Sequence, residues 1–219
     1  MNKKTLKSFA AAGLLLAAFL IFTLLIQHVD VQSIGPNDSC VGFATVNRWF
    51  HDLTGVHLTL YTITDWLGLV PIVVCLCFAA SGLIQLIQRH SLRKVDRNIL
   101  ILGGFYLAVI AAYLFFEAHA VNYRPVLIGG LLEASYPSST TLLTLCVLPT
   151  AIMQLRSRMK CGHVRFAACN ILAVLTAFIV LARLISGVHW FTDIIGGVLL
   201  SGALVLLYRA AVLLSAEEK

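Results

Sequence analysis

Long apolar runs separated by short polar segments recur along the whole chain. Because an α-helix rises about 1.5 Å per residue, roughly 20 apolar residues cross the hydrocarbon core of a bilayer. Six runs reach or approach that length, so the pattern predicts an all-α bundle of six transmembrane helices, forming a single domain over residues 1–219. The predicted spans cover residues 9–27, 66–87, 99–116, 138–155, 166–185 and 194–214.

Composition supports an integral membrane protein over a soluble domain. The chain is 59% hydrophobic and 12% charged, with a mean hydropathy of +0.91. Three lysines precede the first run, as in a secretory signal, but no small-x-small cleavage site follows it, and five further runs do follow. The first run is therefore interpreted as a retained helix.

The basic residues are distributed unevenly between the two sides of the predicted bundle. Thirteen of the 16 Lys and Arg residues lie before the first run, between the second and third, between the fourth and fifth, or at the C-terminal end from Arg209 onwards. The positive-inside rule makes that side cytoplasmic, with both termini on it and the other loops extracytoplasmic. The net charge of +6 thus reflects topology, and no nucleic-acid partner is expected. The three remaining basic residues are Arg48, Arg124 and Arg183.

One polar stretch interrupts the apolar pattern between the last two runs. It contains Arg183, Gly187, His189 and Asp193. If a helix begins near His189, the histidine and the aspartate four residues later share one face. A carboxylate there can fix the imidazole tautomer and leave the other nitrogen free as a base, nucleophile or ligand. Arg183 supplies a fork of donors suited to phosphate, although an interfacial loop facing lipid headgroups would also explain these residues.

Two more polar groups lie on the same predicted side of the membrane. Arg124 and Pro125 follow the third run, and Ser138 with neighbouring hydroxyl residues opens the fourth. Hydroxyls and free backbone N–H groups at a helix N-terminus form a natural anion site. Ser138 can also be a simple helix cap, or it can serve both as cap and as anion ligand.

Together the three groups resemble the signature of the type 2 phosphatidic acid phosphatase family. Arg183, His189 and Asp193 have the family spacing. The family's first motif carries a lysine where this chain has Glu117, and its second carries Gly-His where this chain has Ser139 and Thr140. A further difference is Ala182 at a position where the family usually has serine.

The resemblance implies a mechanism without metal or cofactor. His189 would attack phosphorus and form a phosphohistidine, and Asp193 would orient it. In the family, the histidine of the second motif protonates the leaving group, a role for which the Thr140 hydroxyl is too weakly acidic. Glu117 or His119 could take over as the acid if either reaches the site. The residues expected to bind phosphate are Arg124, Arg183, Ser138 and Ser139.

These substitutions favour a substrate with a good leaving group, such as an extracytoplasmic lipid diphosphate of the polyprenyl carrier type. The alternatives are a degenerate site that binds a lipid phosphate without turnover, and a lipid phosphotransferase. The expected surroundings are a lipid bilayer, with a multi-pass position in a bacterial plasma membrane and the site facing outward. No obligate protein partner is inferred.

Two features between the first two runs complete the prediction. Residues 41–53 have near-helical apolar spacing with Trp49 at an interface, which predicts a short helix on the outer leaflet. Asp65, at the mouth of the second run, is a further candidate to line the site.

Overall fold

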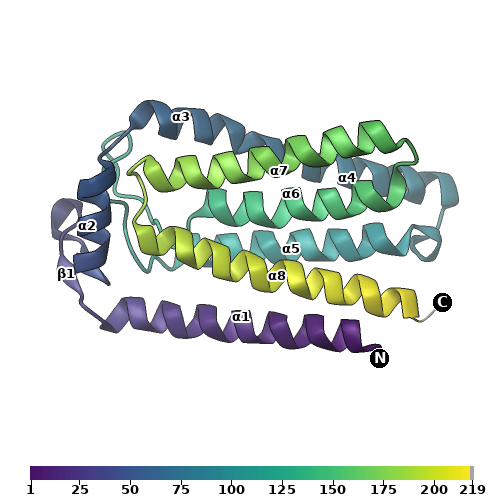
Figure 1. Ribbon diagram of the computed structural model, residues 1–219, viewed down its shortest axis with the longest axis horizontal. Helices are drawn as coiled ribbons and strands as arrows, with labels where there is room; N and C mark the ends of the chain where they lie inside the picture. The colour runs from purple at the N-terminus through teal and green to yellow at the C-terminus, as the bar shows by residue number, and fades with distance from the viewer. Residues whose placement is uncertain (218–219) are drawn as a thin grey trace.

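The computed structural model describes residues 1–217 and is built mainly of long helices running side by side (Figure 1). A two-stranded antiparallel hairpin pairs Gln32 with Val41 and Ser33 with Cys40. The α-helices are α1 (Lys3–His28), α2 (Ala44–Thr54), α3 (Leu58–Leu67), α4 (Leu69–Arg89), α5 (Arg97–Ala118), α6 (Ser139–Arg158), α7 (Gly162–Ile185) and α8 (Phe191–Glu217). The shorter elements are β1 (Gln32–Ser33), η1 (Pro36–Asp38), β2 (Cys40–Val41) and η2 (Leu92–Lys94).

Within the described residues, five helical segments are long and apolar enough to cross a membrane. They are Lys3–His28, Leu58–Arg89, Arg97–Ala118, Gly162–Ile185 and Phe191–Glu217. The second joins α3 and α4, which meet at Gly68. The chain is thus a multi-pass membrane protein, whereas the predicted count of six spans stays a prediction.

The fourth predicted run, which is not among these five segments, forms α6 in the middle of the bundle. This helix contacts α4, α5, α7 and α8 and buries Thr141, Thr144 and Thr150. Neighbouring helices shield it from lipid, so it tolerates hydroxyl side chains that a lipid-facing helix would carry at a cost. The position of α6 therefore accounts for its more polar composition.

The outer faces of the other helices are apolar. Leu14, Leu107 and Val174 are 73%, 69% and 70% exposed, on α1, α5 and α7 respectively. Exposed side chains of this kind, spread around a bundle, suit a hydrocarbon environment rather than water.

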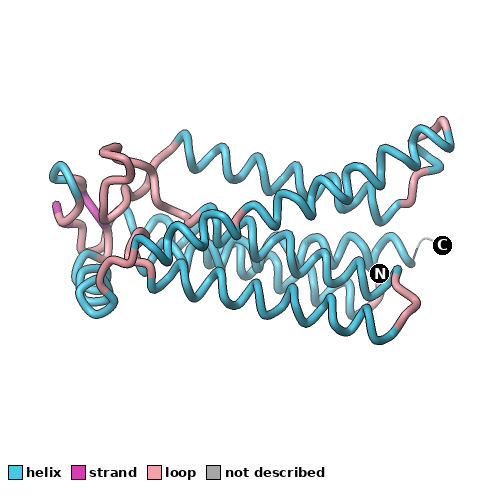
Figure 2. Tube along the Cα trace, turned by 90° about the horizontal axis from the view of Figure 1, so that it is seen from above, coloured by secondary structure: helices cyan, strands magenta, loops and turns pink. Residues whose placement is uncertain are grey.

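The helices gather their connections at two opposite ends (Figures 1 and 2). The start of α1 and the end of α8 lie at one end, where Thr5 Oγ1 donates to Glu217 Oε1 at 2.6 Å. The hairpin, α2, the segment 119–138 and the α7–α8 turn lie at the other end. All three sequence motifs therefore meet at the end of the bundle opposite the start of α1 and the end of α8.

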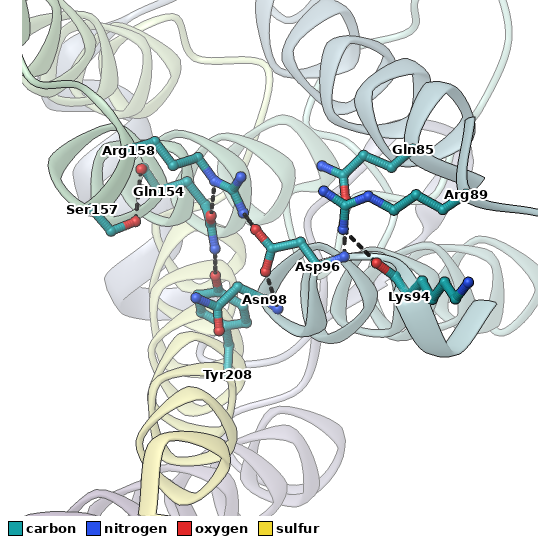
Figure 3. A network of polar contacts seen from close by, with 9 residues as sticks. All are labelled: Gln85, Arg89, Lys94, Asp96, Asn98, Gln154, Ser157, Arg158 and Tyr208. Atoms are coloured by element: carbon teal, nitrogen blue, oxygen red, sulfur yellow. Dashed lines mark hydrogen bonds and ion pairs between the residues drawn. The ribbon is translucent and has the colours of Figure 1, made fainter. Parts of the chain in front are cut away.

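A polar network holds four helices together at the end away from the motifs (Figure 3). Arg158 of α6 contacts Asp96 at the start of α5 at 2.8 Å and donates to Gln154 Oε1 at 2.7 Å. Gln154 in turn donates to the Tyr208 hydroxyl of α8, and the Asp96 amide donates to Gln85 Oε1 of α4 at 2.9 Å. This network fixes the helix ends opposite the motifs.

The short helix predicted between the first two runs is confirmed as α2, but its inward face differs from the predicted apolar stripe. Ala44 and Asn47 are buried, whereas Val46, Trp49 and Leu53 are 43%, 62% and 67% exposed. A polar side chain thus decides which face of α2 packs on the bundle.

Candidate active site

The α7–α8 turn is held in place by the α2–α3 connection. Gly187 adopts φ +70°, and a Cβ added there would lie 2.0 Å from the Gly55 carbonyl oxygen. The His57 amide donates to the Ser186 carbonyl at 2.9 Å. Only glycine fits this close approach, so the third motif contains a backbone requirement beside its chemical residues.

His189 and Asp193 form a buried pair at the start of α8. His189 Nδ1 lies 3.6 Å from Asp193 Oδ2, and the Trp190 amide donates to the same oxygen at 2.9 Å. The side chains are 1% and 0% exposed. His189 lies in the turn and Asp193 in the first helical turn, which brings the pair together much as the four-residue spacing suggests. The other imidazole nitrogen, Nε2, has no hydrogen-bond partner among residues 1–217.

The environment of His189 favours its neutral form. Burial holds the pKa of the imidazole well below its ordinary value, and the nearby charges of Arg124 and Arg183 lower it further. A neutral imidazole keeps a lone pair at Nε2, as a nucleophile requires.

Arg183 points from the last turn of α7 towards α3. It is 1% exposed, and its Nη1 donates to Thr64 Oγ1 at 3.2 Å. Its Nη2 lies 3.5 Å from Asp65 Oδ1, and the guanidinium carbon is 4.6 Å from the centre of the Tyr61 ring. Helix α3 therefore fixes the orientation of this fork of donors.

Arg124 reaches the site from a hairpin-like loop rather than from a helix. Its amide donates to the Glu133 carbonyl at 3.0 Å, and its Nε lies 3.0 Å from Glu133 Oε2. Its guanidinium carbon is 5.8 Å from the centre of the Tyr61 ring. The guanidinium groups of both arginines thus lie near the ring of Tyr61.

Ser138 connects the second motif to the third. Its amide donates to the Asp193 carbonyl at 3.0 Å, and its Oγ is buried without a hydrogen-bond partner in the described part of the chain. The side chain makes no capping bond to α6, so the simple helix-cap interpretation of Ser138 is not what the structure shows. Ser139 and Thr140 are half-buried and line a pocket between α4, α5 and α6.

The two alternative acids lie at the edge of the site. Glu117 is exposed and lines a small recess beside Ser139. His119 is exposed, and its Nδ1 lies 3.0 Å from the Phe115 carbonyl oxygen of its own helix. Within residues 1–217, neither side chain forms a hydrogen bond or ion pair with His189, Arg124 or Arg183.

Asn47 supports the site but carries no signal in the sequence. Its Nδ2 donates to Thr192 Oγ1 at 3.0 Å and to the Gly42 carbonyl at 2.8 Å, while its Oδ1 accepts from the Thr192 amide at 3.2 Å. The clamp joins residues 145 positions apart. No local spacing could reveal such a partnership.

Asn47→Ala is expected to loosen the start of α8 and therefore the His189–Asp193 pair. Leaving the buried Thr192 groups unpaired should lower the free energy of unfolding by about 1–3 kcal/mol. Thermal unfolding in detergent would measure this, with Gln88→Ala, an exposed position on α4, as the control. Equal unfolding temperatures for the two variants would contradict the clamp.

The fold defines a multi-pass helical membrane protein, and its loop end buries a histidine–aspartate pair beside two arginines. The sequence model of the PAP2 superfamily matches residues 104–215, which is just over half of the chain and includes all three motifs. The chain therefore belongs to the PAP2 superfamily, which confirms the resemblance to type 2 phosphatidic acid phosphatases.

A solved structure supports the fold beyond the matched region. The crystal structure described as the first transmembrane PAP2 type phosphatidylglycerolphosphate phosphatase from Bacillus subtilis aligns with a TM-score of 0.56 and 16% identity. The alignment covers 91% of this chain and 94% of that one. No curated protein matches the chain.

Proposed function

We propose that this protein is a membrane phosphatase that hydrolyses lipid phosphates. The observation that carries the proposal is a cluster of buried polar groups without hydrogen-bond partners among residues 1–217. The cluster contains Arg124 Nη1, Arg183 Nε, Ser138 Oγ and His189 Nε2. Buried donors are normally paired, so several unpaired ones beside two arginines suit a phosphate group.

The proposed chemistry follows the arrangement of the pair. His189 Nε2 attacks phosphorus in line and forms a phosphohistidine, which water then hydrolyses. Asp193 holds Nδ1 and stabilises the positive charge that develops on the ring. Arg124, Arg183 and Ser138 bind the equatorial oxygens, where catalysis is mostly positioning and electrostatics.

A lipid substrate is supported by the pocket between α4, α5 and α6. It has a volume of about 570 Å³ and an apolar lining that includes Leu69, Ile72 and Leu143. Ser139 and Thr140 form part of the same lining, directly after Ser138. A hydrocarbon chain in this pocket would therefore place its phosphate at the site. The similar Bacillus subtilis protein is named as a phosphatase of phosphatidylglycerolphosphate, itself a phospholipid.

The leaving group decides between substrates. Thr140 stands where the family has its acid. When a lipid diphosphate is cleaved, the leaving group is a lipid phosphate, which needs less protonation than the alkoxide that leaves from a monophosphate. The purified protein should release phosphate from a lipid diphosphate faster than from the monophosphate with the same chain. Thr140→His should speed monophosphate hydrolysis more than diphosphate hydrolysis, because an imidazole acid helps most where the leaving group is poor.

Two results of that experiment would favour the alternatives. Binding of a lipid phosphate without turnover by the wild type, with turnover only after Thr140→His, would indicate a degenerate site. Transfer of the phosphoryl group to an added alcohol in preference to water would indicate a phosphotransferase.

We further propose that the site faces away from the cytoplasm of a bacterial plasma membrane. The support is the excess of basic residues at the end of the bundle opposite the motifs. Leu131→Cys in a background without other thiols should react with an impermeant reagent on intact cells, because Leu131 is 67% exposed at the site end. A variant that keeps only Cys161, exposed in the α6–α7 turn, should react only after lysis. The reverse pattern would overturn this orientation.

A further inference from the structure

Asp65 lies where α3 meets α4, beside the second motif. Its Oδ1 is 3.5 Å from Arg183 Nη2, and its side chain is 60% exposed. Gly68, three residues later on the same helical face, packs against the start of α6, because a Cβ added there would lie 3.6 Å from Thr140 Cγ2. Asp65 therefore contacts Arg183 and lies one helical turn from the residue that packs against Thr140, which replaces the family histidine.

The same carboxylate faces the apolar pocket. Asp65, Ser139 and Thr140 all line it. In an in-line displacement the leaving oxygen is opposite the attacking atom, here His189 Nε2, and it carries the lipid chain. A chain in this pocket thus directs its leaving oxygen towards the side on which Asp65 lies.

We propose that Asp65 is the general acid for the leaving group, in the place of the missing histidine. This inference rests on the proposed function. In the first step, the His189 Nε2–P bond forms, the P–O bond to the lipid breaks, and the Asp65 carboxyl gives its proton to the leaving oxygen. In the second step, water attacks phosphorus and gives a proton to the Asp65 carboxylate, while the His189 Nε2–P bond breaks. Phosphate is released, and His189 and Asp65 return to their starting forms.

The other candidate acids are less well placed. The Thr140 hydroxyl is too weakly acidic. Glu117 lines a separate recess, and His119 is bonded to its own helix. Asp65 is the one carboxylate in the described chain that both contacts a phosphate-binding arginine and lines the pocket for the lipid chain.

The Asp65 carboxyl must hold a proton when the P–O bond to the lipid breaks, and the attacking water of the second step returns that proton to it.

The test compares Asp65→Asn with wild type on a lipid monophosphate and on the diphosphate with the same chain. The expected result is a kcat lower by about 100-fold on the monophosphate, because the acid is lost where the leaving group is poor. On the diphosphate the loss should be several-fold at most. Thr140→His in the Asp65→Asn background should restore monophosphate turnover, since imidazole replaces the missing acid.

Glu133→Gln is the matched control, since Glu133 pairs with the other arginine at 3.0 Å. It should change both substrates alike. Equal losses on both substrates for Asp65→Asn, or no rescue by Thr140→His, would overturn the acid role and leave only the positioning of Arg183. A wild type inert on every lipid phosphate would instead overturn the proposed function and this inference with it. Vanadate binding by Asp65→Asn, measured by calorimetry, would verify that the variant is folded.

Discussion

His189→Ala is expected to reduce phosphate release by about 10⁴-fold or more, because the nucleophile itself is removed. Asp193→Asn should keep more activity, since it loses orientation and charge stabilisation but not the attacking nitrogen. Phosphate release from a lipid diphosphate in detergent would measure both. An acid-labile phosphorylated intermediate should form in the wild type and be absent from His189→Ala. His163→Ala, an exposed histidine at the opposite end of the bundle, is the control.

The pH dependence gives a second measurement of the same residue. Burial and the charges of Arg124 and Arg183 lower the pKa of His189, so the free enzyme should keep its kcat/KM below the pH at which an ordinary histidine protonates. Activity should then fall as the pH drops through that lowered pKa. Folding stability should fall in the same direction, because the unfolded histidine binds its proton first. Near-normal turnover by His189→Ala would contradict the nucleophile, and an acid limit above about pH 6.5 would contradict the neutral ring.

Arg183→Lys is expected to lower kcat/KM by about 10²–10³-fold, although the charge is retained. The planar fork contacts Thr64 and Asp65 and leaves Nε for the substrate. An ammonium group cannot reproduce that geometry, and arginines that stabilise a transferring phosphoryl group are worth about 10³–10⁵-fold in rate.

Vanadate inhibition would show whether the loss concerns the transition state, since vanadate adopts a five-coordinate geometry. Its inhibition constant should rise in Arg183→Lys in step with the loss of kcat/KM. Arg48→Lys, an exposed arginine on α2, should leave both unchanged. A fully active Arg183→Lys would show that a point charge is sufficient and that the fork has no role.

The sequence predicted the presence of the long helices better than it predicted where they begin and end. The second span was predicted to begin at residue 66, but the helical segment begins at Leu58. Asp65 interrupts the apolar run there, and in the structure this carboxylate is 60% exposed and lies 3.5 Å from Arg183.

Some contacts in the site join residues close together in the sequence and could be predicted, whereas others join distant residues and could not. His189 and Asp193 are four residues apart, so helical geometry alone suggested that they meet. Arg124 reaches Tyr61 through a loop, and Asn47 clamps α8 across 145 positions. No periodic pattern in the sequence predicts either contact.

The sequence by itself determined a membrane-spanning helical chain, the polar stretches that interrupt it, and the family to which those stretches point. These follow from apolar length and from residues close together along one helix, which short-range geometry governs. Only the tertiary structure decided that α6 lies at the centre, that Asp65 lines the apolar pocket between α4, α5 and α6, and that Glu117 and His119 remain at the edge. Those outcomes depend on which distant helices pack together, and packing between segments far apart is set by the whole chain at once.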